Sequence, residues 1–220
     1  MKYRSLAFAV LLVTPLVALG TLFWPAPGAT PARAAAPPAG SRTAVLAGGC
    51  FWGMEEVFEN LQGVSNVVSG FAGGSAATAQ YETVSTGTTG HAESVEITYD
   101  PKRISYDQLL DVFFTVAHDP TELNRQGPDE GTQYRSAIFY ADAGQQREAE
   151  AYIRRLTAEK RFSSPIVTQV VPLRGFYPAE AYHQHFARLH PDYPYIVIND
   201  APKLAALRER FPKLVKANVN

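Results

Sequence analysis

Apolar and polar residues follow two spacings along the chain, one typical of strands and one typical of helices. Between 91 and 99, apolar residues alternate with a period of two, which predicts a strand with one buried face. Between 51 and 61, Met54, Val57, Phe58 and Leu61 share one helical face, and Gly63 ends that pattern. Over the whole chain, these spacings predict strands at 43–47, 66–72, 91–99, 134–141 and 166–173, a short extended segment at 195–198, and helices at 51–61, 105–117, 145–160, 178–189 and 203–210.

The order of these elements indicates a mixed α/β fold around one layered core. Ser105 with Gln108 forms the signature of a capping box, and Pro178 suits the first turn of a helix. A long polar loop at 118–133 interrupts the regular elements, and such a loop in a small domain is often functional. We place a single folded domain at 41–214, followed by a short tail at 215–220.

The first 40 residues have the pattern of a targeting segment. Lys2 and Arg4 precede an apolar run at 6–24, and a stretch rich in proline and alanine follows up to Gly40. We interpret 1–40 as an export signal with a linker, cleaved near Ala34 or Ala36, which predicts a periplasmic protein. The apolar run has nearly the length that crosses a bilayer, so an uncleaved anchor is the alternative. Both interpretations export the folded domain.

Composition and charge narrow the chemistry further. The formal net charge is −1, which indicates neither a nucleic-acid partner nor an acidic membrane surface. The 220 residues contain one cysteine, so no disulfide can form within the chain. We expect a monomer.

That cysteine, Cys50, lies where a strand is expected to pass into a helix. Free N–H groups and the positive end of the helix dipole stabilise a thiolate there. Gly48 and Gly49 would let the backbone approach a ligand closely. An isolated free cysteine is more often a buried small apolar residue, but the neighbouring glycines and aromatic residues favour a reactive site. Glu55 and Glu56 would raise the pKa of the thiol if they lie close to it.

Glu93 is a candidate acid because of its place in the strand predicted at 91–99. It shares one face of that strand with Val95, Ile97 and Tyr99. If this face is buried, loss of hydration raises the pKa of the carboxyl. The alternative is a glutamate in solvent at the end of a strand.

Four further segments of the chain form a recognisable set. They are GGCFWG at 48–53, GHAE at 90–93 with Tyr81 upstream, QGPDEGTQYRS at 126–136, and AEAYHQ at 179–184. Each is a weak signal alone, but their order along the chain is specific, and they span most of the region from Thr43 to Arg188. Together they resemble the A-type peptide-methionine sulfoxide reductases.

The resemblance implies a two-layer α/β sandwich that reduces the S epimer of methionine sulfoxide, free or in oxidised proteins. It also implies roles for individual residues. Cys50 would be the nucleophile and Glu93 the acid, while Tyr81 and Tyr134 would donate hydrogen bonds. Phe51 and Trp52 would hold the methyl group of the substrate, and Asp129 would be a further substrate-binding residue.

The chain departs from many relatives because it lacks the additional cysteines that they carry near the C-terminus. Position 85, a cysteine in many of them, is Ser85. A sulfenic acid formed on Cys50 would therefore need an external thiol, either a small thiol or a thioredoxin-like protein. We expect no bound cofactor. We also expect no metal, because His183 and His185 lie two residues apart and would point to different faces of a helix.

Two other functions are compatible with the sequence. The chain could be another cysteine enzyme, either a thiol peroxidase or a hydrolase that uses His91 or His183 as its base. It could also be a module that binds methionine sulfoxide without reducing it.

Overall fold

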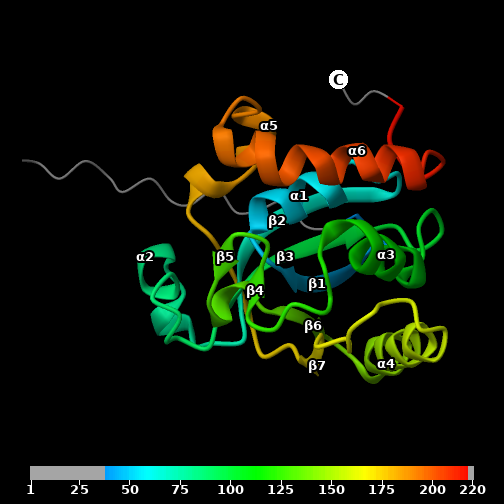
Figure 1. The fold of residues 1–220 in the computed structure, drawn as a ribbon, viewed down its shortest axis with the longest axis horizontal. Helices are drawn as coiled ribbons and strands as arrows, with labels where there is room; N and C mark the ends of the chain where they lie inside the picture. The colour runs from blue at the N-terminus through cyan, green and yellow to red at the C-terminus, as the bar shows by residue number, and fades with distance from the viewer. Residues whose placement is uncertain (1–37, 218–220) are drawn as a thin grey trace, which may run out of the picture. The chain divides into compact units, whose positions relative to one another are not determined.

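A six-stranded mixed sheet forms the centre of the protein (Figure 1). The structure is a computed structural model, and it describes residues 38–217. The strand order is β7-β6-β1-β3-β2-β8, and only the β6–β7 pair is parallel. The strands are β1 (Arg42–Gly48), β2 (Val64–Ala72), β3 (Ala92–Tyr99), β6 (Ser136–Tyr140), β7 (Gln169–Pro172) and β8 (Phe176–Pro178).

Six α-helices accompany the sheet in the described part of the chain. They are α1 (Phe51–Glu59), α2 (Tyr81–Val84), α3 (Tyr106–Val112), α4 (Ala143–Ala158), α5 (Phe186–Leu189) and α6 (Ala201–Arg210). The helix of α3 continues as a π-helical turn (Phe113–Ala117), and a second π-helical turn (Ile196–Asp200) leads into α6. Short 3-10 turns cover Ala76–Thr78, Thr132–Tyr134 and Ala181–His183.

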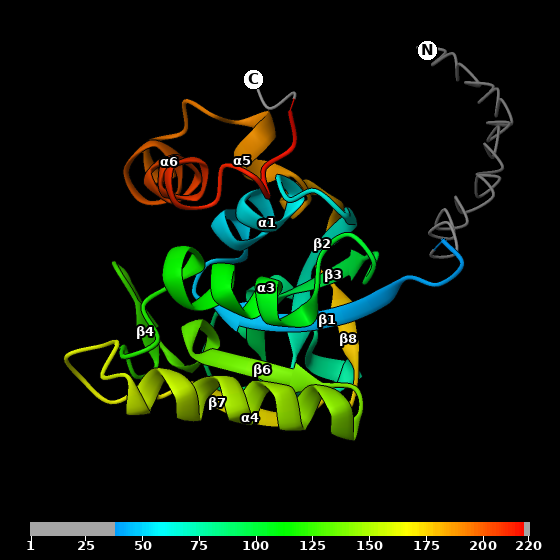
Figure 2. The same cartoon turned by 90° about the vertical axis from the view of Figure 1, so that its right-hand side faces the viewer.

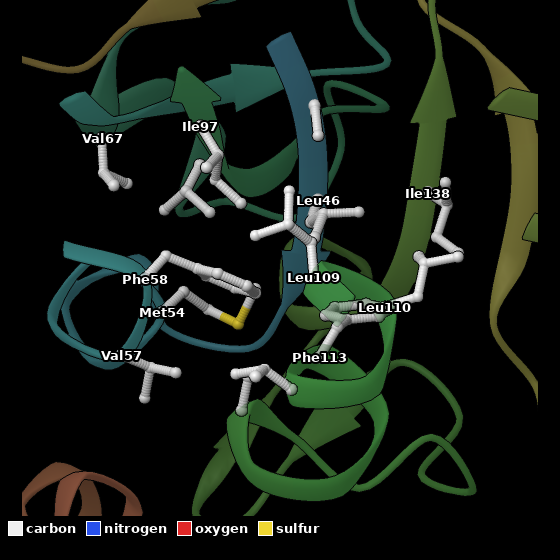
Figure 3. Close-up of a cluster of buried hydrophobic side chains, with 14 of the residues drawn as sticks. Leu46, Met54, Val57, Phe58, Val67, Ile97, Leu109, Leu110, Phe113 and Ile138 are labelled. Carbon is white, nitrogen blue, oxygen red and sulfur yellow. The ribbon is translucent and has the colours of Figure 1, made fainter. Parts of the chain in front are cut away.

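The main core lies between one face of the sheet and helices α1, α3 and α4 (Figure 2). Met54, Val57 and Phe58 of α1 face the side chains of α3 and the π-helical turn after it (Figure 3). Full burial of one such side chain contributes roughly 1.5–3 kcal/mol. Alternate residues of the strands, including Val45 and Phe139, form a smaller cluster on the opposite face. The predicted combination of a mixed sheet with flanking helices is confirmed.

Local sequence signals determine where several helices begin. Ser105 caps α3, with its side chain accepting from the backbone of Gln108 while the Gln108 side chain accepts from the backbone of Ser105, so the predicted capping box is present. Asp142 caps α4 by accepting from the backbone N–H groups of Gly144 and Gln145.

The prediction of a helix at 178–189 is wrong. Pro178 ends β8, which pairs with β2, and only a 3-10 turn and the one-turn helix α5 follow. The side chain of Gln184 accepts from the N–H of Ser69 and donates to its carbonyl, which ties this segment to the edge of β2. His185 has a φ of 56°, in the left-handed region, and this conformation breaks a continuous helix. Tertiary hydrogen bonds therefore replace those of the expected helix.

Three smaller predictions also need correction. The segment 195–198 is not extended, because Ile196 begins the π-helical turn before α6. The loop at 118–133 contains a small hairpin of β4 (Arg125–Gln126) and β5 (Asp129–Glu130). Tyr134 belongs to a 3-10 turn, and β6 begins two residues later.

The targeting segment predicted for 1–40 lies almost wholly outside the described residues. Among residues 38–217, no helix combines the length and the apolar character needed to cross a membrane. At the other end, Val215 forms a β-bridge with Leu61, and the N–H of Lys216 donates to the carbonyl of Asn60. These contacts hold the start of the predicted tail against the end of α1.

Candidate active site

Cys50 sits at the junction of β1 and α1, where it is the N-cap residue of the helix. Gly49 has a φ of 94°, so glycine is required for the turn. A Cβ on Gly48 would lie 2.9 Å from Cγ of His118, and one on Gly49 would lie 2.5 Å from Cγ of Gln126. The two glycines therefore make room for neighbouring side chains of the protein itself, rather than for a ligand as the sequence suggested.

A cavity of about 160 Å³ opens beside Cys50. It brings together every residue that the sequence proposed for the site, although these residues come from five separate segments. Its lining consists of Cys50, Phe51, Trp52, Tyr81, Glu93, Asp129, Tyr134 and one residue that the sequence did not indicate, Tyr195.

Cys50 is largely buried, with an exposed fraction of 8% for the whole residue. Burial raises its pKa well above the ordinary value, and the charges of Glu93 and Asp200 raise it further. The backbone N–H of Trp52 and the ammonium of Lys203 lower it. The thiol is thus protonated in the resting site.

Glu55 and Glu56 are not the carboxylates that raise the pKa of Cys50. Both follow the first turn of α1, and no acidic residue lies within that turn. The carboxylate of Glu55 accepts instead from the hydroxyl of Ser69 and the backbone N–H of His185.

The face of β3 that carries Glu93 is buried, as proposed for the acid. Val95, Ile97 and Tyr99 are fully buried beside it, and Glu93 is 3% exposed. Burial raises the pKa of Glu93 to about 8, and the nearby charge of Asp129 adds to the rise. The backbone N–H of Phe51 donates to Oε2 of Glu93 at 3.1 Å, and this hydrogen bond lowers the pKa of the carboxyl in part. The carboxyl is therefore mostly protonated at neutral pH, next to the residue that follows Cys50.

Three tyrosines place phenolic groups in the same cavity. Burial raises the pKa of Tyr81 and of Tyr134, and the charge of Glu93 is the next cause for both. Burial also raises the pKa of Tyr195, whose hydroxyl donates to Oδ2 of Asp129. All three keep their protons at neutral pH and serve as hydrogen-bond donors.

Aromatic packing holds Phe51 and Trp52 in place as walls of the cavity. The indole N–H of Trp52 donates to Nδ1 of His183 at 3.1 Å. Its ring stacks on Phe186 with a centroid separation of 3.9 Å and an interplanar angle of 13°. The ring of Phe51 lies 5.0 Å from that of His183 and 5.8 Å from that of Phe71. An apolar group in the cavity would therefore meet a rigid aromatic surface beside the thiol.

Comparison with known families accounts for this constellation. The family model described as peptide methionine sulfoxide reductase matches residues 42–215. The chain belongs to the peptide methionine sulfoxide reductase family.

Curated relatives agree with that assignment. The peptide methionine sulfoxide reductase MsrA 2 of Mesorhizobium japonicum is 58% identical over 175 residues, which cover 80% of this chain and 90% of the relative. The MsrA 2 of Synechocystis sp. is 50% identical over 178 residues, which cover 81% of this chain and 83% of the relative.

Solved structures share the fold. Reduced Mxr1 from Saccharomyces cerevisiae matches with a TM-score of 0.67 at 34% identity, covering 71% of this chain and 89% of that one. Methionine sulfoxide reductase A of Corynebacterium diphtheriae matches with a TM-score of 0.61 at 38% identity, covering 70% of this chain and 76% of that one. The predicted family, fold class and enzyme class, an oxidoreductase that reduces methionine sulfoxide, are confirmed.

Sequence reasoning missed part of the framework of this methionine sulfoxide reductase. Tyr195 lies 66 residues after its partner Asp129, and no local spacing links the two. Asp200 is 1% exposed and ion-paired to Lys203 at 3.1 Å, yet it follows an apolar stretch without a recognisable motif. The segment AEAYHQ does point to this framework, because its residue His183 accepts a hydrogen bond from the indole of Trp52.

Proposed function

We propose that Cys50 reduces methionine sulfoxide with Glu93 as the proton donor. One observation carries the assignment of roles. The thiol, a buried neutral carboxyl and two fixed aromatic walls line a single cavity of about 160 Å³. A sulfoxide needs all three, since its sulfur is attacked, its oxygen gains a proton and its methyl group requires an apolar surface.

The first half-reaction balances with these two residues. The sulfur of Cys50 attacks the sulfoxide sulfur while Glu93 protonates the oxygen, and the thiol proton restores Glu93. Transfer of the hydroxyl to Cys50 breaks the sulfur–oxygen bond, so that methionine leaves and Cys50 remains as a sulfenic acid. Tyr81 and Tyr134 donate hydrogen bonds to the developing charge on oxygen.

The second half-reaction needs two thiols from outside the chain. The first attacks the sulfenic acid, forms a mixed disulfide with Cys50 and releases water. The second attacks that disulfide, restores the thiol of Cys50 and leaves as an oxidised disulfide. The single cysteine of the sequence makes a small thiol or a thioredoxin-like protein the reductant that we propose. Turnover with each donor, followed as methionine formed, distinguishes them.

The cavity supports selection of a single epimer of the sulfoxide, and we propose that this is the S epimer because the resemblance to the A-type reductases implies it. The aromatic walls would contact the methyl group of the substrate, and Glu93 would contact its oxygen. Cys50 would attack the sulfur from a third direction. Three fixed directions at a pyramidal sulfur define its hand, and each epimer of methionine sulfoxide has its own class of enzyme.

Incubation of the protein with each epimer and dithiothreitol tests the proposal. We expect methionine from the S epimer only, and none from either epimer with Cys50→Ser. Binding of the sulfoxide without methionine formation would favour the non-catalytic module. After one turnover without reductant, mass spectrometry should find one added oxygen on Cys50, and an unmodified thiol beside product would contradict the sulfenic-acid scheme.

The histidine positions argue against a cysteine hydrolase. A hydrolase needs a base beside its thiol, and the lining of the Cys50 cavity, within residues 38–217, includes no histidine. Nδ1 of His183 accepts from Trp52, and the ring of His91 contacts the backbone of Gly74 and Ser75. An ester substrate should therefore give no product.

We also propose that residues 1–40 direct export, with the catalytic domain in the periplasm. The proposal rests on the basic start, the apolar run and the small residues around Ala34 and Ala36. N-terminal sequencing of protein recovered from fractionated cells should begin just after one of these alanines. A membrane-bound protein that keeps Met1 would indicate an anchor instead, and a cytoplasmic protein would contradict export.

A further inference from the structure

A second cluster of potential ligand atoms lies further along α1 than the catalytic cysteine. Glu55 and Glu59 are four residues apart, so they occupy the same face of the helix. His185 joins them from the turn before α5. One ligand atom from each of the three residues lies within 4.8 Å of the other two. The sequence indicated no carboxylates around this histidine, and only the fold brings them there.

Two atoms of this cluster have no hydrogen-bond partner. Glu55 is 1% exposed, and its Oε2 accepts from Ser69 and from the backbone of His185 at 2.8 and 2.9 Å. Its other oxygen, Oε1, is buried and accepts no hydrogen bond, and the same holds for Nδ1 of His185. Yet these two atoms face each other at 3.2 Å, and Oε1 of Glu59 lies 2.5 Å from the same nitrogen.

An imidazole nitrogen that faces two carboxylate oxygens at these distances can share either a proton or a metal ion with them. A buried carboxylate oxygen without a hydrogen-bond partner is unfavourable, because it has lost its hydration and gained nothing in its place. Ligands of a tetrahedral metal ion lie roughly 3.3 Å apart when each bond is about 2.0–2.1 Å long. The Glu55–His185 separation already fits, and Glu59, whose side chain is 19% exposed, needs to move by about 1 Å.

We propose that Glu55, Glu59 and His185 bind a divalent first-row metal ion, with zinc(II) as the ion that fits best. An imidazole favours zinc over magnesium or calcium, and two carboxylates balance its charge. A cavity of about 320 Å³ lined by Glu59 and His185 gives access and leaves room for water as a fourth ligand.

Two cations nearby compete with such an ion. Nε of Arg188 lies 3.9 Å from Oε2 of Glu59, but its side chain is 58% exposed and free to turn outward. Nζ of Lys216 donates to the backbone carbonyl of Glu59, which leaves the carboxylate of Glu59 available.

The position of the site explains what a bound ion would do. The segment 183–186 holds the aromatic wall, because His183 accepts from Trp52 and Phe186 stacks on it. His185 lies between these two residues, and both carboxylates belong to α1. The ion would therefore fasten the wall to the helix that carries Cys50, without taking part in the redox chemistry.

Titration with zinc chloride tests the site on the full-length chain. The protein should carry Cys50→Ser and be free of added thiols, so that zinc has no thiolate to bind. We expect binding of one ion per chain by calorimetry. The melting temperature should rise by about 5–10 °C at one hundred times the dissociation constant, and EDTA should reverse the rise.

Matched variants separate the site from other zinc-binding groups. His185→Asn suits the left-handed backbone at this position, and Glu59→Gln keeps the shape of the side chain. Each should weaken zinc binding at least tenfold and remove the rise in melting temperature. His190→Asn, at an exposed histidine nearby, and Glu56→Gln, on the same helix, should leave both unchanged.

The alternative is an ion pair in which protonated His185 binds both carboxylates. It predicts that zinc neither binds in a one-to-one ratio nor stabilises the protein, while His185→Asn lowers the melting temperature in EDTA. That outcome, or zinc binding that survives both His185→Asn and Glu59→Gln, would overturn the proposal.

Discussion

Replacement of Glu93 by glutamine removes the proposed proton donor with little change in shape. The amide oxygen can still accept from the N–H of Phe51, which now donates to Oε2 of Glu93 at 3.1 Å. A positioned general acid contributes roughly 10²- to 10⁴-fold. Tyr81 and Tyr134 line the same cavity and remain as hydrogen-bond donors to the sulfoxide oxygen of the substrate. We therefore expect Glu93→Gln to slow methionine formation by about 10²- to 10³-fold.

The pH dependence gives a second magnitude for the same change. With a pKa of about 8, the carboxyl of Glu93 is roughly nine-tenths protonated at pH 7 and one-tenth protonated at pH 9. The acid-dependent step of the native protein should therefore slow about tenfold over this range, and Glu93→Gln should lack that descent. Since the charge of Glu93 also raises the pKa of Cys50, alkylation of Cys50 should reach its midpoint at a lower pH in the variant.

Single-turnover reaction with the S epimer measures the step without the titration of a reductant. One equivalent of methionine per chain is followed over time between about pH 6 and pH 10, so that both limbs of the profile are seen. Glu96→Gln is the matched control, because Glu96 lies on the same strand but alternates to the other face. A Glu93→Gln rate within threefold of the native rate, or an unchanged profile, would refute Glu93 as the acid.

Three further predictions concern Tyr195, Gly53 and the pH dependence of stability that Glu93 causes. Tyr195→Phe removes the hydrogen bond to Asp129 and should lower kcat/KM about tenfold, or roughly 1.4 kcal/mol, whereas an unchanged value would remove Tyr195 from the site. Gly53→Ala improves helix propensity but places a Cβ 2.0 Å from Oδ1 of Asp200. The free energy of unfolding, measured by urea denaturation, should therefore fall by about 1–3 kcal/mol, and a higher value would contradict the clash. Between pH 4.5 and 8 the carboxyl of Glu93 holds a proton in the folded state but has lost it in the unfolded state, because folding raises its pKa to about 8. The free energy of unfolding therefore falls as the pH rises across this window. The expected loss up to pH 7 is roughly 3 kcal/mol. Glu93→Gln should flatten that part of the stability curve, and parallel curves for the two proteins would disprove the linkage.

The sequence by itself determined the elements whose causes are local. The capping box of Ser105 and Gln108 begins α3, and the alternation along β3 places Glu93 with Val95 on one buried face. The pattern of α1 likewise buries Met54 and Phe58. In each case the signal that predicts the structure lies within one or two turns of the chain, or on one face of one strand.

The ordered motifs also determined most of the candidate site. Seven residues proposed from the sequence line one cavity, although no spacing between their segments foretold how closely they meet. The pKa of Cys50 shows the limit of this reasoning. The sequence pointed to Glu55 and Glu56, which are near in the chain, whereas Glu93 and Asp200 are near in space.

Only the tertiary structure decided the conformation of the segment after Pro178. Its composition suits a helix, but Gln184 and His185 hydrogen-bond to β2 and α1, and these distant partners replace the bonds of a regular helix. Tyr195 reaches Asp129 for the same reason. Such contacts join residues more than 60 positions apart, and the pairing depends on how the sheet and helices pack rather than on any local preference.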